Sequence, residues 1–285
     1  MADALEVLPE LPATGAAFAR SLLPRPVRRP AGLPGHAVMV TGHRQDPDRL
    51  ARYLRLCGFT LRDAAPPTWL HVLAFPLHLH LLTDPATTMQ VPGMVHVSNS
   101  MRLLRPVTLA ERLDLVVRVG NLRPHRRGAQ FDFVAQARVG DEPVWDGVST
   151  YLATGVTVPG DAPDADRAGF TGVDPIALWR LPGDLGRQYR SVSGDPNPIH
   201  TSRLAARALG FPRAIAHGMW THARVLAALE NRLPPTYRIE VDFTKPVPLP
   251  GTVGFWASRQ DETWQAAVTT RDGSRPHLLA RIDPR

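Results

Sequence analysis

Hydrophobic and polar positions along this chain predict two buried helices and several strands. Residues 68–82 are almost continuously apolar and contain one proline and three histidines, which predicts a buried helix. This run is shorter than the roughly 18 apolar residues that a membrane span requires. Residues 218–229 predict a second helix, and residues 114–119 and 254–258 alternate as strands do.

The same order of elements occurs twice. Residues 104–113 resemble residues 244–253, and a predicted helix lies upstream of each copy. Downstream, residues 130–153 and 263–282 each predict two strands joined by a turn. One helix followed by a series of strands, repeated once, is an α+β pattern.

A segment rich in proline, glycine and aspartate separates the two copies. The length of 285 residues also favours two domains, each large enough for its own core. We therefore predict an N-terminal domain over residues 1–155, a linker over residues 156–172 and a C-terminal domain over residues 173–285.

The run of residues 189–200 reads Tyr-Arg-Ser-Val-Ser-Gly-Asp-Pro-Asn-Pro-Ile-His. Two prolines disfavour a helix, so the run is predicted to form a stiff loop that leads into a helix. It presents Asp195 beside His200, and a carboxylate with a neutral imidazole can position a water and move its proton. The alternative is a simple turn in which Asp195 caps the helix that follows.

Together with Ile-Ala-His-Gly-Met at residues 215–219, this run resembles the signature of the MaoC-like, or (R)-specific enoyl-CoA hydratase 2, family. The resemblance is strong over residues 185–256 and degenerate in the first half. It implies a double hot-dog fold, in which each half wraps a long helix in an antiparallel sheet. The stretch before Thr68 contains no equivalent of Asp-x-Asn-Pro-x-His, so we predict that the first half has lost catalysis. The first helix then either lines a tunnel for an acyl chain or only completes the core.

The resemblance implies reversible hydration of trans-2-enoyl-CoA, or dehydration of an (R)-3-hydroxyacyl thioester, in fatty-acyl metabolism. Asp195 and His200 are expected to hold one water and exchange its proton, and Asn197 to orient the loop or the water. The N–H of Gly218, at a helix start, is expected to stabilise the thioester oxygen. His217 either supports the site or packs as a structural residue. The residues expected to bind substrate are Ser193, His217, Met219 and Lys245.

No cofactor is expected, because coenzyme A enters as part of the substrate. No metal site is expected either. The single cysteine, Cys57, is predicted to be buried. His71, His78 and His80 lie in an apolar stretch without a carboxylate or cysteine partner, so they are predicted to be structural.

The net charge of +7 comes almost entirely from scattered arginines, and no nucleic-acid motif accompanies it. We expect no nucleic-acid partner and no membrane partner, whereas an acidic thioester of coenzyme A or of an acyl carrier protein would suit this charge. Candidates for phosphate contacts, or else for simple solvation, are Arg203, Arg207, Arg213 and Lys245.

Acidic residues precede any basic one at the N-terminus, so a cytoplasmic location is expected. Either a monomeric pseudo-dimer or a homodimer is compatible with the repeat. Two alternative functions stay open at this point: a non-catalytic subunit that binds acyl-CoA or a partner, and a dehydratase that acts on acyl carrier protein substrates.

Overall fold

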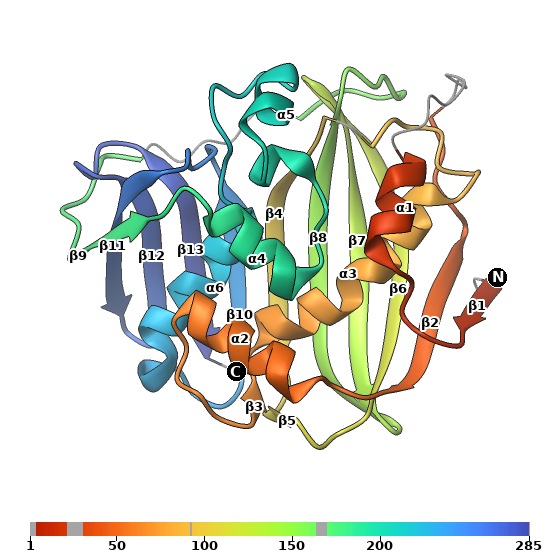
Figure 1. Ribbon diagram of the computed structural model, residues 1–285, viewed down its shortest axis with the longest axis horizontal. Coiled ribbons are helices and arrows are strands. Elements are labelled where there is room, and N and C mark those ends of the chain that lie inside the picture. The colour runs from red at the N-terminus through yellow and green to blue at the C-terminus, as the bar shows by residue number, and fades with distance from the viewer. Residues whose placement is uncertain (1–3, 22–30, 92, 164–169, 285) are drawn as a thin grey trace.

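The computed structural model describes residues 4–21, 31–91, 93–163 and 170–284. Two helix-and-sheet halves share one sheet of eleven strands (Figure 1), in the order β1-β2-β6-β7-β8-β4-β10-β13-β12-β11-β9. Neighbouring strands are antiparallel except for the β1–β2 pair, which is parallel. The α+β, double hot-dog prediction is confirmed.

The elements of the first half are β1 (Ala4–Leu8), α1 (Thr14–Ser21), β2 (His36–His43), α2 (Pro47–Cys57), β3 (Ala64–Ala65), α3 (Pro67–Thr83), β4 (Met94–Leu103), β5 (Val107–Thr108), β6 (Leu113–His125), β7 (Gly128–Val139) and β8 (Glu142–Thr154). Those of the second half are β9 (Ala177–Leu181), α4 (Leu185–Ser193), the 3-10 helix η1 (Pro198–His200), α5 (Arg203–Ala208), α6 (Gly218–Leu229), the 3-10 helix η2 (Glu230–Arg232), β10 (Tyr237–Phe243), β11 (Gly251–Gln260), β12 (Thr263–Thr270) and β13 (Pro276–Pro284).

The two predicted helices are the central helices of the halves. Helix α3 agrees with the prediction to within one residue at each end, and α6 has the predicted bounds. Nearly every side chain of α3 is buried because the helix is apolar on all faces and packs against sheet, α1 and α6. The predicted strands at residues 114–119 and 254–258 lie inside β6 and β11.

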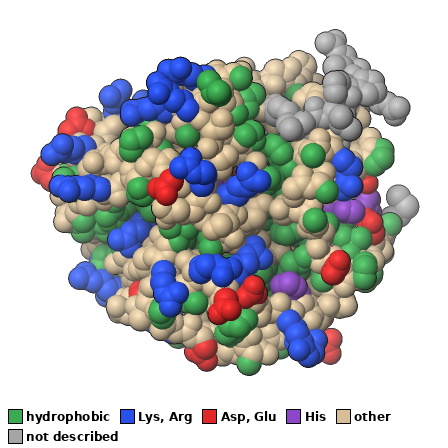
Figure 2. Space-filling model, in the orientation of Figure 1, with side chains coloured by type: hydrophobic (Ala, Val, Ile, Leu, Met, Phe, Trp, Pro, Cys, Tyr) green, Lys and Arg blue, Asp and Glu red, His purple; other side chains and the backbone are tan. Residues whose placement is uncertain are grey.

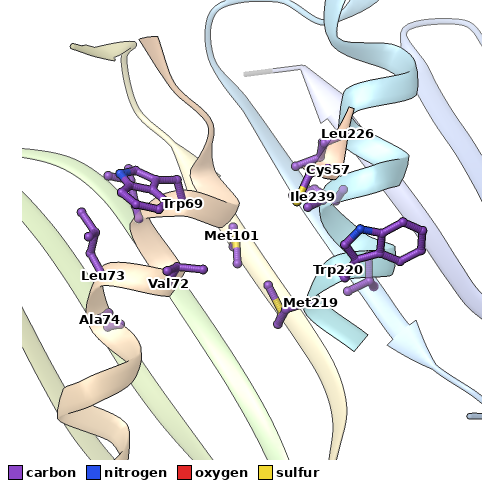
Figure 3. Packing of buried hydrophobic residues seen from close by; sticks show 14 of the residues in the cluster. Cys57, Trp69, Val72, Leu73, Ala74, Met101, Met219, Trp220, Leu226 and Ile239 are labelled. Atoms are coloured by element: carbon purple, nitrogen blue, oxygen red, sulfur yellow. The ribbon is translucent and has the colours of Figure 1, made fainter. Parts of the chain in front are cut away.

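Strand β4 joins the halves at the centre of the sheet. It pairs with β8 of its own half and with β10 of the other half, and this places Met101 opposite Ile239. Figure 3 shows Met101 between Val72 of α3 and Met219 of α6. The two helices therefore pack in one continuous core.

Cys57 is buried and unpaired in this core, as predicted. The predicted domain limits stay predictions, and residues 164–169 of the proposed linker lie outside the described residues. Among the described helices, none has the length and apolar character needed to cross a membrane. The cytoplasmic location and the oligomeric state stay predictions as well.

Basic side chains are spread over the face of the molecule shown in Figure 2, with acidic side chains among them. This face carries no single basic stripe of the kind that follows a nucleic-acid backbone.

Candidate active site

The first part of the 189–200 run is helical, so the loop prediction was wrong there. Tyr189 lies within α4, which ends at Gly194 in the left-handed conformation with φ 77°. The N–H of Gly194 donates to the carbonyl of Arg190 at 2.8 Å. The prolines follow this stop, and proline restricts its own residue and the one before it, so residues 189–193 are free to be helical.

The loop proper is held by a chain of side-chain-to-backbone hydrogen bonds. Ser193 Oγ accepts from the N–H of Asp195 at 3.2 Å, and Asp195 Oδ1 accepts from the N–H of Asn197 at 2.9 Å. Asn197 Oδ1 in turn caps η1 through the N–H of Ile199 at 3.3 Å.

Asp195 therefore caps neither helix that follows it, because Ser202 caps α5. The alternative of a simple turn with an Asp195 cap was wrong in this respect. The second carboxylate oxygen of Asp195 stays available to the site.

His200 is buried at the end of η1, and its hydrogen bond shows which ring nitrogen carries the proton. Its Nδ1 lies 2.8 Å from the carbonyl oxygen of Ile215. Because a carbonyl only accepts, Nδ1 carries the proton and Nε2 keeps a lone pair. Burial lowers the pKa of His200 more than Asp195 and the Ile215 carbonyl raise it, so the imidazole is neutral near pH 7.

His217 lies against both members of this pair. Its ring stacks on His200 with centroids 3.7 Å apart, and its Nε2 lies 3.7 Å from Asp195 Oδ2. Both ring nitrogens are buried without a hydrogen-bond partner. Burial, with a smaller effect of His200, holds the pKa of His217 well below its ordinary value.

Asp195, His200 and His217 each place one potential ligand atom within 4.8 Å of the others. Imidazole lone pairs lie in the ring plane, so the stacked rings of His200 and His217 direct them within two roughly parallel planes. A tetrahedral ion needs ligands that converge on one point. The arrangement suits proton transfer better than metal binding, and a site without metal stays a prediction.

Gly218 begins α6, where an N–H has no carbonyl partner within the helix. The helix dipole also favours negative charge at this point. A Cβ at this position would lie 3.0 Å from the ring of Phe243. A side chain at this position would therefore require the ring of Phe243 to shift slightly.

One cavity of about 580 Å³ contains every residue that the sequence assigned to the site. These residues are Ser193, Asp195, Asn197, His200, His217, Gly218, Met219 and Lys245. Helix α3 of the first half contributes His71, Val72 and Phe75 to the wall. The first helix therefore contributes to the cavity wall, and its role as the lining of an acyl tunnel stays a prediction.

The cavity residues that sequence reasoning missed include three rings from the strands: His96 on β4, Tyr151 on β8 and Phe243 on β10. Their rings contact one another, since His96 stacks on Tyr151 at 4.6 Å and lies 4.9 Å from Phe243. No local pattern marks these residues. Phe243 directly precedes the second copy of the repeat, and this position was the only feature of the sequence that could have indicated it.

A second cavity of about 510 Å³ shares Lys245 and His277 with the first and contains Arg213, Arg271 and Arg275. Two of the four predicted phosphate contacts, Arg213 and Lys245, thus lie together. The other two, Arg203 and Arg207, lie on α5 and line neither of these cavities.

The predicted structural histidines differ in their surroundings. His71 and His78 are buried, with ring centroids 5.4 Å apart. The prediction that His80 has no carboxylate partner was wrong, because its Nε2 lies 3.0 Å from Glu6 Oε2. Glu6 lies on β1, far from His80 in sequence, so the apolar stretch alone could not reveal this contact.

The sequence model of the family described as MaoC like domain matches residues 177–274 of this chain. The chain is 35% identical over 257 residues to 3-hydroxyacyl-thioester dehydratase X of Mycobacterium tuberculosis, and the match covers 90% of this chain and 92% of that protein. The crystal structure of HtdX from the same organism has a TM-score of 0.79 at 33% identity, and the match covers 88% of this chain and 100% of that one. A MaoC-like dehydratase from Phytophthora capsici shares the fold, with a TM-score of 0.71 at 17% identity over 93% of this chain and 97% of that chain.

Proposed function

Because this chain belongs to the MaoC-like family of hydratases and dehydratases, we propose that it interconverts (R)-3-hydroxyacyl and trans-2-enoyl thioesters by removing or adding water. One observation carries the assignment of the reacting groups. The Nδ1–H of His200 is committed to the Ile215 carbonyl, so its basic Nε2 is free beside Asp195 in the cavity that Gly218 lines.

In the hydration direction, Asp195 and His200 hold one water between them. The pair removes a proton from this water as its oxygen forms a bond to the β-carbon of the enoyl thioester. The π electrons of the double bond move toward the thioester oxygen, and the α-carbon then takes a proton from the pair. Dehydration uses the same groups in reverse order.

Negative charge develops on the thioester oxygen in both hydration and dehydration. The N–H of Gly218, together with the dipole of α6, stabilises this charge. Asn197 uses its side-chain oxygen to hold the loop through Ile199, so it acts as a positioning residue for Asp195 and His200.

Coenzyme A is the proposed carrier. Arg213, Lys245, Arg271 and Arg275 line the cavity that adjoins the active site, and guanidinium groups bind phosphates in bidentate fashion. The reaction needs no other cofactor in this proposal.

The test is the loss of enoyl absorbance from crotonyl-CoA and from a longer trans-2-enoyl-CoA. Wild type is compared with Asp195→Asn and His200→Ala, and circular dichroism verifies folding of each variant. We expect turnover by wild type and a loss of at least about 1,000-fold in each variant. Binding of acyl-CoA without turnover at any chain length would instead favour the non-catalytic subunit.

A further inference from the structure

A side chain of the first half reaches the end of the helix that leads into the loop of Asp195. Helix α2 of the first half packs against α4 of the second (Figure 1). The Nε of Arg49 on α2 donates to the carbonyl of Val192 at 2.7 Å, and its Nη2 donates to that of Ser193 at 3.4 Å. Val192 and Ser193 are the last two residues of α4, where carbonyls have no partner within the helix. The guanidinium of Arg49 therefore caps the C-terminus of α4.

Arg49 itself has a defined place. Asp46 Oδ1 caps the start of α2 by accepting from the N–H of Arg49 at 3.0 Å. The guanidinium carbon lies 5.2 Å from the centroid of the Trp69 ring, and an aromatic face attracts a cation. Trp69 is fully buried on α3, and its Nε1–H donates to Gln45 Oε1 at 3.0 Å. The side chain of Arg49 thus contacts both α3 and α4.

The carbonyls that Arg49 holds lie close in sequence to the carboxylate of the proposed reaction. Ser193 is held twice, since its carbonyl accepts from Arg49 and its Oγ accepts from the N–H of Asp195 at 3.2 Å. Asp195 Oδ1 then accepts from the N–H of Asn197 at 2.9 Å. A Cβ on Gly194 would lie 3.8 Å from Nη2 of Arg49. A movement of the α4 C-terminus therefore moves the carboxylate of Asp195.

The other member of the pair, His200, is held by residues outside α4. Its Nδ1 lies 2.8 Å from the carbonyl oxygen of Ile215, and its ring stacks on His217. A shift of Asp195 would thus change its distance from His200. We propose that Arg49 is a positioning residue that keeps Asp195 in place beside His200, so that the first half completes an active site whose motif lies in the second. This inference rests on the proposed function, because it assumes that the two groups share one water.

The geometry of arginine suits this role. Its planar guanidinium directs several N–H groups in a fixed fork, so one side chain can reach two successive carbonyls. A positive charge at the C-terminus of a helix also interacts favourably with the helix dipole. Lysine keeps the charge but carries its donors on a single nitrogen at the end of a flexible stem. Arg49→Lys therefore separates the effect of the fork from that of the charge.

Steady-state kinetics of crotonyl-CoA hydration tests the role. We expect kcat of Arg49→Met to fall about 100-fold with KM changed less than about threefold, because a misplacement of about 1 Å at a reacting group has an effect of this size. Arg49→Lys should lose only about tenfold. Arg55→Met is the matched control, because Arg55 is exposed on the same helix, and it should keep the kcat of wild type. Values of kcat within about twofold of wild type in both Arg49 variants would overturn the proposal.

Hydrogen–deuterium exchange measures the order of the loop without any turnover. We expect exchange over residues 190–200 to be about tenfold faster in Arg49→Met than in wild type, with exchange in α6 unchanged. Faster exchange throughout the chain would show a general loss of stability and would overturn a specific role. If Arg49→Met does not fold, Arg49→Lys is compared with wild type, and equality in both kcat and exchange overturns the role. Absence of turnover by wild type would refute the proposed function, whereas unchanged exchange over residues 190–200 would refute the role of Arg49.

Discussion

The imidazole rings of His200 and His217 stack face to face at 3.7 Å, and only His200 has a hydrogen bond to the backbone. His217 thus limits the movement of His200 through ring contact, whereas Nδ1 of His200 is held by Ile215. The sequence left open whether His217 supports the site or only packs. In the proposed reaction, the stack gives His217 a positioning role toward the imidazole of His200.

Replacement of His217 by phenylalanine should therefore preserve most of the activity. The phenyl ring keeps the stack on His200, so we expect kcat to fall less than about tenfold in His217→Phe. His217→Ala removes the stack and should lower kcat by about 100-fold, with KM changed little. Steady-state kinetics with crotonyl-CoA measures both parameters. Equal losses in the two variants would mean that a nitrogen of His217 takes part in the reaction.

Activity should depend on the neutral form of His200. Its pKa lies below the ordinary value of 6.5, mainly because of burial. We expect kcat/KM to stay constant as the pH falls to about 6.5 and to decline only below that pH, as Nε2 becomes protonated. A pH profile of kcat/KM measures the midpoint. A midpoint above pH 6.5 would contradict the proposed role of burial.

The residues of the predicted site lie together in the structure because the motif is local. Asp195, Asn197 and His200 lie within six residues, and their loop is shaped by Gly194 and two prolines, so proximity in sequence became proximity in space. Gly218 could also be predicted as a site residue, because the start of its helix has a recognisable sequence pattern. The helix over residues 68–82 was equally evident, since its apolar character is continuous.

The rest of the site depends on contacts between distant segments. Tyr151 and Phe243 meet His96 because β4 pairs with both β8 and β10, and no spacing in the sequence records this order of strands. The pairing of His80 with Glu6 depends in the same way on the placement of β1 beside β2. The sequence did not predict that α4 extends to Ser193. The two prolines were taken as evidence against a helix for the whole run, although they lie several positions after these residues.

Buried neutral histidines should make folding stability sensitive to acid. Burial lowers the pKa of His71 to about 4 and of His222 to about 3, whereas the unfolded chain has ordinary values near 6.5. Below pH 6.5 the unfolded state binds more protons, so the free energy of unfolding falls as the pH falls. Each such histidine should reduce it by about 2 kcal/mol between pH 7 and pH 5.

Urea denaturation at a series of pH values measures this effect. His222→Phe should lose less stability between pH 7 and pH 5 than wild type does, because one buried titrating group is absent. His36→Asn is a suitable control, since His36 is partly exposed and faces Glu6. The same slope in His222→Phe and wild type would show that His222 does not titrate on unfolding in this range.

The N–H of Gly218 can serve the thioester oxygen only if the space in front of it stays open. An alanine there would place its Cβ 3.0 Å from the ring of Phe243. The ring or the start of α6 must then shift, so we expect kcat/KM of Gly218→Ala to fall by about 100-fold or more, as when one donor to a developing oxyanion is lost. Crotonyl-CoA hydration measures this ratio.

Gly15→Ala separates this effect from a general cost of replacing glycine near a helix start. Gly15 is the second residue of α1, and a Cβ there would meet nothing within 4 Å. Its kcat/KM should equal that of wild type. If Gly218→Ala folds and turns over crotonyl-CoA at the rate of Gly15→Ala, the ring of Phe243 accommodates the Cβ, and a glycine is not required in front of the thioester oxygen.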